Sequence, residues 1–410
     1  MAKIDVAHYD FSKKGFFAAF IIIVNTFSWY FPLYFFFEDI VGKSHAGSSI
    51  LFLTLTIHYV GAIGSAVVGT ALVNTFLRQH TFLRLWMFVG VISSAMLIVL
   101  DAYNVSYLLS VSFLLGISLG LGFPSGLAYF GNCTHEENRG RLGGITFSAS
   151  SLGMLIIGTL TNVFTFAIGA LFFTFWRGLG LVLFYLVGSK QEYKRSMTNV
   201  SYKSILLDRY FVLYLVPWIM FCLVNFLELP IVASFIGEDL ALLILVAEYG
   251  FGGFSAFIGG RYADSVGRKR IIIFGFIVLG IGYAVLGLFS ALTLSWYLYI
   301  ILDGIAWGIF ILMFYLVIWA DLAGNKAKEK YYLIGVLPFI VSGYIQVLFA
   351  PYAKSIPIYV AFSLASFFLF LAVLPLLFAP ETLSEKEIEK KRLQKYLEDV
   401  EKVKKKHEKR

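Results

Sequence analysis

The chain has 410 residues, of which 59% are hydrophobic and only 14% are charged. Together with a mean hydropathy of +0.81, this composition excludes a soluble globular protein and indicates an integral membrane protein. The net charge of +8 does not predict nucleic-acid binding, because the basic residues form short clusters at the ends of apolar runs. The two cysteines, Cys133 and Cys222, predict neither a disulfide nor a metal site, and no cofactor is expected.

Apolar runs long enough to cross a bilayer, about 20 residues each, occur twelve times along the chain. The first is too long for the core of a signal peptide and is followed by Glu38 and Asp39, so we expect a retained helix. The expected fold is therefore all-α, with twelve transmembrane helices. The predicted spans cover residues 15–37, 47–70, 82–100, 105–130, 143–164, 167–188, 210–230, 239–260, 270–290, 294–320, 331–353 and 357–379.

The distribution of Lys and Arg predicts the orientation of these helices. If both termini are cytoplasmic, thirty of the 33 cations lie on the inner side of the membrane. Lys43 and Lys354 lie on the outer side, and Arg177 lies within the sixth span. Because cytoplasmic loops retain an excess of positive charge, we expect a multi-pass protein in the lipid bilayer of the plasma membrane, with both termini inside.

The longest polar connection, residues 190–209, divides the chain into two six-helix halves, residues 1–189 and 210–380, with a charged cytoplasmic tail at 381–410. Short patterns recur between the halves at an offset of about 190 residues. Such recurrence indicates an internal duplication. The matched positions are Gly69 with Gly260, Gly116 and Gly120 with Gly304 and Gly308, and Asn132 and Arg139 with Asp321 and Lys328.

A short cationic loop follows the eighth predicted span, at residues 260–270. It carries Gly260, Asp264, Gly267 and Arg268 at the spacing Gly-x-x-x-Asp-x-x-Gly-Arg, which resembles the signature loop of the major facilitator superfamily of secondary transporters. The resemblance implies that the Asp contacts a loop Arg and the positive N-terminus of a neighbouring helix in one conformation only. We therefore predict a conformational latch here, against the alternative of a loop that only sets the topology.

Arg139 and Asp321, at the ends of equivalent spans, are predicted to belong to the same latch. The stretch before Arg139 resembles the sugar-porter branch, in which an acid stands seven residues before Arg-Gly, and the run 380–382, Pro-Glu-Thr, resembles the end of the twelfth helix there. The chain departs from the family pattern in four places. The loop from Gly69 to Gln79 lacks the signature Asp, and the seventh span lacks the paired Gln of sugar porters. Asn132 stands where the acid is expected, and Ser112 replaces an expected Arg.

The superfamily resemblance implies two weakly similar six-helix bundles around a central cavity. It also implies a monomeric secondary active transporter that moves a small organic solute, a sugar or an organic acid, by alternating access. Two alternatives remain open: an exporter of apolar or drug-like compounds, and a solute sensor with a transporter fold. An enzyme is not expected, since no catalytic or metal-ligating cluster occurs within any predicted span.

Polar residues at membrane depth are the candidates for the solute pathway, since such residues are costly in lipid and usually face a cavity or a partner. Asp303 and Trp307 lie one turn apart in a span that the resemblance places at the cavity. Prolines bend the first and seventh spans near other candidates. Each candidate alone could instead join two helices. The predicted pathway residues are Asn25, Trp29, Arg177, Asn225, Asp303, Trp307 and Gln346.

A proton-coupling site is predicted at Glu248. Counted inward from Gly260, Glu248 lies 12 residues deep, about 18 Å at 1.5 Å per residue, near the middle of a hydrocarbon core about 30 Å thick. His58 occupies nearly the equivalent position of the first half and could share the proton. The alternative is that both residues are buried and satisfied by neighbouring helices.

The tail carries apolar residues at helical spacing on a stretch rich in Lys and Glu. These residues are Leu393, Tyr396, Val400 and Val403. The pattern predicts a surface helix on the anionic inner leaflet, with a solvated charged tail as the alternative.

Overall fold

The computed structural model describes residues 13–45, 49–75, 78–187, 200–235, 238–353 and 355–384, with five isolated residues of the tail. The described residues form helices and no strand, which confirms the predicted all-α class. Part of the predicted central connection, residues 190–199, and Val403 of the tail lie outside the described residues. Within the tail, Leu393, Tyr396 and Val400 are exposed.

Among the described residues, seven helices precede the central connection. They are α1 (Lys13–His45), α2 (Ser49–Thr75), α3 (Gln79–Ile98), α4 (Val105–Gly120), α5 (Phe123–Cys133), α6 (Arg139–Val163) and α7 (Phe166–Val187). The later elements include one short stretch of π-helix, η1. They are α8 (Tyr202–Leu206), α9 (Arg209–Phe235), α10 (Glu238–Val266), α11 (Arg268–Phe289), α12 (Thr293–Ile311), η1 (Leu312–Val317), α13 (Ile318–Ala323), α14 (Lys328–Ala353), α15 (Ile358–Leu371) and α16 (Val373–Phe378).

Eleven segments of the described chain are long and apolar enough to cross a membrane. Three of them combine shorter elements: α4 with α5, α12 with η1 and α13, and α15 with α16. The remaining eight are α1, α2, α3, α6, α7, α9, α11 and α14. The predicted eighth span corresponds to α10, which has 29 residues but is not among the eleven. The eleven segments are drawn from described residues, and the first part of α10, residues 238–243, lies outside the residues whose side chains are described.

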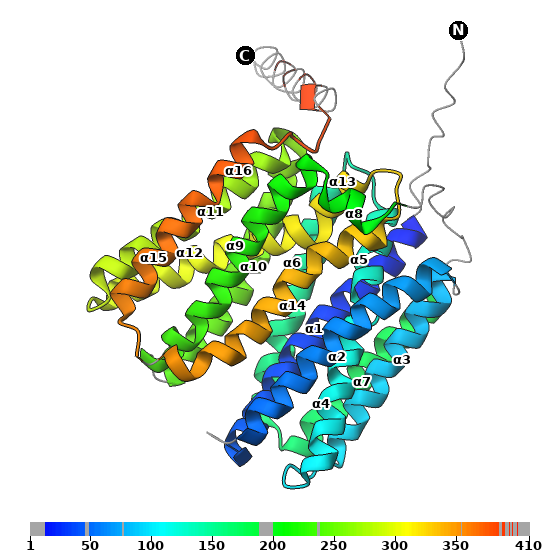
Figure 1. The fold of residues 1–410 in the computed structure, drawn as a ribbon. Coiled ribbons are helices and arrows are strands. Elements are labelled where there is room, and N and C mark those ends of the chain that lie inside the picture. The colour runs from blue at the N-terminus through cyan, green and yellow to red at the C-terminus, as the bar shows by residue number, and fades with distance from the viewer. Residues whose placement is uncertain are drawn as a thin grey trace, which may run out of the picture.

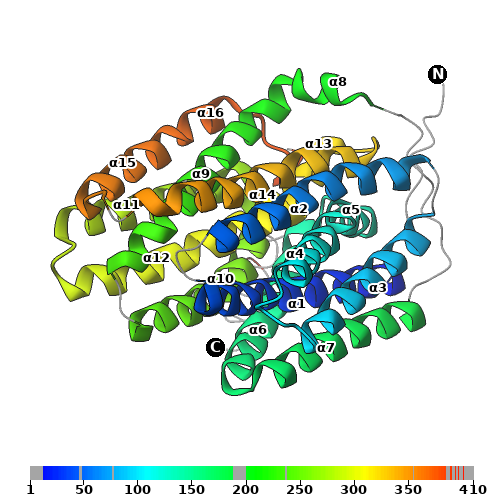
Figure 2. The same ribbon diagram turned by 60° about the horizontal axis from the view of Figure 1, so that its bottom comes forward.

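Figure 1 shows most of the N-terminal helices, blue to cyan, on one side of the bundle and most of the C-terminal helices, green to red, on the other. The two sets meet where α6 packs on α10 and where α14 packs on α2. Figure 2 shows α14 running alongside α2. At one end of the bundle lie the start of α1 and the short helices α8 and α13 (Figure 1). We call this end the basic end.

One close helix contact occurs twice, once in each half. A Cβ atom on Gly120 of α4 would lie 1.9 Å from the carbonyl oxygen of Ala62 in α2, and one on Gly308 of α12 would lie 2.0 Å from that of Gly252 in α10. Only glycine allows backbones to approach so closely. The two pairs are related by the offset of about 190 residues found in the sequence. The duplicated sequence pattern therefore corresponds to a duplicated packing contact.

Two glycines with positive φ end helices at the basic end. Gly267, with φ of 108°, separates α10 from α11, and Gly324, with φ of 54°, follows α13. Residues with a Cβ rarely adopt such angles, so glycine permits the sharp reversal at both places. The reversal at Gly267 brings the start of α11 beside the end of α10, where the charged loop residues meet.

Candidate functional site

A cavity of about 150 Å³ lies between the two sets of helices. Its walls come from α1, α2, α4, α5, α6, α9, α10, α12 and α14. On α1 the lining residues run from Phe27 to Glu38, in the part of the helix that lies away from the basic end. About half of the lining residues are aromatic. The cavity is therefore a largely apolar pocket with a few polar groups, which is the usual composition of a small-molecule site.

Four of the residues predicted for the solute pathway line this cavity: Asn225, Asp303, Trp307 and Gln346. The indole Nε1 of Trp307 donates a hydrogen bond of 2.7 Å to Oδ1 of Asn225, which joins α12 to α9. Asp303 and Trp307, one turn apart on α12, both face the same space. The cavity therefore contains a polar edge within its aromatic wall.

Three acidic residues of the second half line the cavity from three helices: Glu228 of α9, Glu248 of α10 and Asp303 of α12. Both carboxylate oxygens of Glu228 accept hydrogen bonds, one from the hydroxyl of Tyr283 and one from that of Tyr299. A hydrogen bond joins the carboxyl groups of Glu248 and Asp303. Two carboxyl groups can form such a bond only when one of them holds a proton.

Asn25, Trp29 and Arg177 do not line this cavity. Their place in the solute pathway stays a prediction. Arg177 of α7 is fully buried and contacts two indole rings. Its guanidinium carbon Cζ lies 4.4 Å from the ring centroid of Trp29 and 4.8 Å from that of Trp86. Its Nη1 donates to Oδ1 of Asn25 at 2.8 Å and to the hydroxyl of Thr26 at 3.0 Å. Arg177 thus joins α7, α1 and α3 through cation–π contacts and hydrogen bonds.

We expect Arg177→Lys to destabilise the protein while leaving solute binding unchanged. Lysine retains the charge but loses the planar contact with the indole rings and the hydrogen bonds of Nη1, at a cost of about 1–3 kcal/mol. Thermal unfolding of the purified variant should show a lower midpoint, and the affinity for any bound solute should match that of the wild type. Loss of affinity without loss of stability would instead make Arg177 a solute ligand.

His58 does not contact Glu248 in this conformation. Its Nε2 lies 2.6 Å from the hydroxyl of Tyr30, and its ring packs against Tyr34 and Tyr59. Tyr30, Tyr34 and Tyr59 line the cavity, whereas His58 is buried behind them. The imidazole is therefore separated from the acids of the opposite half by a layer of tyrosines.

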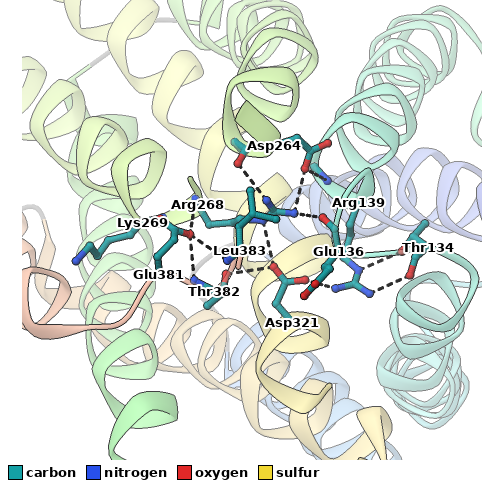
Figure 3. Close-up of polar contacts among 12 residues, drawn as sticks. Thr134, Glu136, Arg139, Asp264, Arg268, Lys269, Asp321, Glu381, Thr382 and Leu383 are labelled. Carbon is teal, nitrogen blue, oxygen red and sulfur yellow. Dashed lines mark hydrogen bonds and ion pairs between the residues drawn. The ribbon is translucent and has the colours of Figure 1, made fainter. Parts of the chain in front are cut away.

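The residues predicted to form a latch meet at the basic end. We call Arg139, Asp264, Arg268 and Asp321 the ion-pair cluster (Figure 3). The side chain of Asp321 is fully buried and pairs with Arg139 on one side and with Nε of Arg268, at 3.1 Å, on the other. Asp321 therefore connects the start of α6 to the start of α11. Burial and the charge of Asp321 raise the pKa of nearby Glu136, while the two arginines act in the opposite direction.

Asp264 makes the contacts that the sequence pattern predicts. Its carboxylate lies 3.0 Å from Nη2 of Arg268. It also accepts hydrogen bonds from the backbone N–H groups of Gly140, at 2.9 Å, and Arg141, at 2.7 Å. These are the first turn of α6, whose N-terminus favours a negative charge. Asp264 thus joins the end of α10 to the start of α6 across the two halves.

Gly260 and Gly140 allow this contact to form. A Cβ on Gly260 would lie 2.2 Å from the backbone oxygen of Gly140, and a Cβ on Gly140 would lie 2.5 Å from Oδ1 of Asp264. One turn further along, a Cβ on Gly144 would lie 2.5 Å from the backbone oxygen of Ala256. Helices α6 and α10 therefore touch through their backbones near the basic end, which leaves no passage between them there.

Glu381 is a member of this region that the sequence interpretation missed. Its carboxylate accepts hydrogen bonds from the backbone N–H of Arg268, at 2.7 Å, and of Lys269, at 3.2 Å (Figure 3). The acid therefore caps the N-terminus of α11. The neighbouring Thr382 donates its hydroxyl to Asp321 at 3.1 Å. The Pro-Glu-Thr motif was visible in the sequence, but nothing there indicated which helix it would contact.

Glu38 and the aromatic wall of the cavity were also missed. Glu38 lines the cavity near the end of α1, but in the sequence it reads as a polar residue that follows a span. Phe31, Phe226 and Phe339 line the cavity from three helices. With 42 phenylalanines in the chain, no local pattern separates those that face a cavity from those that face lipid.

The chain thus forms a helical bundle with eleven segments apolar enough to cross a membrane, a cavity between its two sets of helices and an ion-pair cluster at the basic end. The model of the Major Facilitator Superfamily matches residues 18–330, about three-quarters of the chain. The chain belongs to the Major Facilitator Superfamily, a family of transporters and not of enzymes. No match to a curated protein sequence was found.

Solved structures with the same fold include transporters of different solutes. The proton:xylose symporter XylE bound to 6-bromo-6-deoxy-D-glucose is 16% identical, with a TM-score of 0.70 over 92% of this chain and 98% of that chain. The human organic anion transporter MFSD10 is 12% identical, with a TM-score of 0.67 over 88% and 98%. A double-tryptophan variant of XylE is 15% identical, with a TM-score of 0.67 over 92% and 98%. At such identities the similarity concerns the fold.

Proposed function

We propose that this protein is a secondary active transporter that moves a small organic solute across the plasma membrane by alternating access. The observation that supports it most is a cavity between the two sets of helices, together with an ion-pair cluster that joins the same two sets at the basic end. Opening that end requires the buried pairs to separate. The cluster would then act as a latch that holds one of two conformations.

The proposed architecture has twelve spans in two halves, residues 1–189 and 210–380, joined by residues 190–209 and followed by the tail at 381–410. Helix α10 is the proposed eighth span. Its 29 residues reach about 44 Å at 1.5 Å per residue, enough for a hydrocarbon core of about 30 Å. The excess of Lys and Arg at the basic end supports a cytoplasmic location of that end and of both termini. The latch would then close the cytoplasmic side, with the protein acting as a monomer.

The size of the cavity favours a transporter of a small solute over the alternative, an exporter of drug-like compounds. Its volume of about 150 Å³ lies below the roughly 300–1,000 Å³ of pockets that hold drug-sized ligands. A sugar has the appropriate size, and the polar edge formed by Asn225, Trp307 and Gln346 suits its hydroxyl groups. The second solute class predicted from the sequence, an organic acid, has less support because acidic residues line the cavity from four helices.

Measuring solute flux across a membrane distinguishes a transporter from a solute sensor with the same fold. The purified protein reconstituted in liposomes should accumulate or exchange a solute that also stabilises it in a thermal-shift screen against sugars, carboxylates, amines and amino acids. A solute that binds but does not cross the membrane would identify the protein as a sensor with a transporter fold.

Proton coupling through Glu248 is a further part of the proposal. Because Glu248 shares a hydrogen bond with Asp303, a change in solute occupancy near Asp303 would alter which of the two holds the proton. We expect solute accumulation in liposomes to respond to a proton gradient, and Glu248→Gln to abolish that response while leaving exchange of solute intact. Wild-type accumulation that ignores the gradient would contradict the coupling, and a Glu248→Gln variant that still responds would move it to another acid, with Asp303 next.

A further inference from the structure

We propose that the solute is a cation, a small organic molecule with a protonated amine, and that the carboxyl group of Asp303 binds the ammonium. This inference rests on the proposed transport function and replaces its broad solute class by one chemical class. It is based on the charges around the cavity, on one carboxyl oxygen that lacks a partner, and on the aromatic walls.

The described residues that line the cavity carry acidic groups and no basic one. Glu38, Glu228, Glu248 and Asp303 belong to the lining, and none of the lining residues is Lys, Arg or His. Arg177, the fully buried cation of α7, lies between two indole rings outside the cavity. In surroundings of low dielectric constant, an anionic solute would meet uncompensated repulsion, whereas a cation would be attracted.

Asp303 has an oxygen available for a ligand. Both oxygens of Glu228 accept hydrogen bonds from tyrosine hydroxyls, and Glu248 shares a hydrogen bond with Asp303. Oδ1 of Asp303, by contrast, has no hydrogen-bond partner among the described residues, and the residue is only 2% exposed. A buried acceptor without a donor is costly. The N–H groups of an ammonium would satisfy it and form a charge-assisted hydrogen bond.

The residues that line the cavity favour an organic cation as the ligand over a metal ion. The described part of the chain holds no group of three His, Cys, Asp or Glu residues able to bind a metal ion. Hard metal ions need six or more converging oxygens. Around Asp303 the lining offers aromatic faces instead, including Trp307, Tyr249 and Phe339. Aromatic faces attract organic ammonium groups by cation–π contact and bury the apolar part of the same molecule.

A set of probes of similar size tests the charge directly. Calorimetric titration of the wild-type protein in detergent at neutral pH would use benzylamine, which is protonated, benzyl alcohol, which is neutral, benzoate, which is anionic, and D-xylose. We expect benzylamine to bind at least about tenfold more tightly than any of the other three. Equal binding of benzylamine and benzyl alcohol, or tighter binding of benzoate or D-xylose, would overturn the inference.

Single substitutions test the assignment to Asp303. Asp303→Asn keeps the shape of the side chain and removes its charge, so benzylamine binding should weaken at least about tenfold. The matched control is Asp39→Asn, which removes an exposed acid of α1 that pairs with Lys43, and it should bind as the wild type does. If Asp303→Asn does not fold, the wild-type titrations decide the charge preference alone. Wild-type affinity in folded Asp303→Asn would reject Asp303 as the ligand.

Failure of this inference is distinct from failure of the transport function. If liposomes that contain the protein move D-xylose and benzylamine does not bind, the protein is a transporter of another solute class. If benzylamine binds in an Asp303-dependent manner but does not cross the membrane, the cation site is confirmed and the proposed transport function is rejected.

Discussion

Asp321→Asn is expected to open the basic end of the protein and to lower its stability. The substitution leaves the buried guanidinium groups of Arg139 and Arg268 without the carboxylate that they share. Removing one partner of a buried ion pair typically costs about 3–5 kcal/mol, because the remaining charge stays desolvated. The conformation in which the cluster is closed should lose this amount relative to one in which both arginines reach water.

The native cysteines supply the readout. Cys133, at the end of α5, is 4% exposed beside the ion-pair cluster, and Cys222 can be replaced by serine so that Cys133 is the sole thiol. In Asp321→Asn, we expect a polar maleimide to label Cys133 at least about tenfold faster, together with a lower thermal midpoint. Asp39→Asn serves as the control, since it removes an acid from an exposed pair. Labelling of Cys133 at the wild-type rate would mean that the cluster does not hold this end closed.

Gly260→Ala is expected to separate α6 from α10 without removing any charge. The added methyl group would lie 2.2 Å from the backbone oxygen of Gly140, a contact that no side-chain rotation can relieve. The helices must move apart, which breaks the hydrogen bonds from Gly140 and Arg141 to Asp264. The expected result is again faster labelling of Cys133, now with all four charges of the cluster in place.

Gly250→Ala is the matched control for this second substitution. Gly250 lies on the same helix, and a Cβ there would meet nothing within 4 Å. The same chemical change, with the same small gain in helix propensity, should leave the labelling rate unchanged. If both alanine variants behave like the wild type, the close contact of α6 and α10 does not control access at this end.

The sequence predicted the helical class well, because spans of about 20 apolar residues carry a strong signal. Two members of the ion-pair cluster, Asp264 and Arg268, were also predictable, since they stand at fixed spacing with Gly260 and Gly267 in one short loop. Its connection to Asp321 depends on how α13 lies against α6 and α11, which is a tertiary arrangement. The predicted role of these residues as a latch stays a prediction until the substitutions above are measured.

The cavity was predicted only in part, for a physical reason. Asp303 and Trp307 stood out because polar and charged residues are rare at membrane depth. The same criterion selected Arg177, Asn25 and Trp29, which are buried in helix contacts outside the cavity. A buried polar residue that joins two helices and one that faces a solute look alike in sequence, because both avoid lipid. Only the packing of α7 against α1 and α3 separates the two cases.

The π-helical element η1 lies between two acids with different surroundings, Asp303 at the cavity and Asp321 in the ion-pair cluster. The two acids are eighteen residues apart, about five whole turns at 3.6 residues per turn, so an uninterrupted α-helix would point both in the same direction. A π turn accommodates an additional residue and rotates all that follows by about 100°. The wider turn therefore sets the angular register of Asp321. Removing one residue from Leu312–Val317 would turn its carboxylate away from the arginines, toward the side of the helix that carries Asp303.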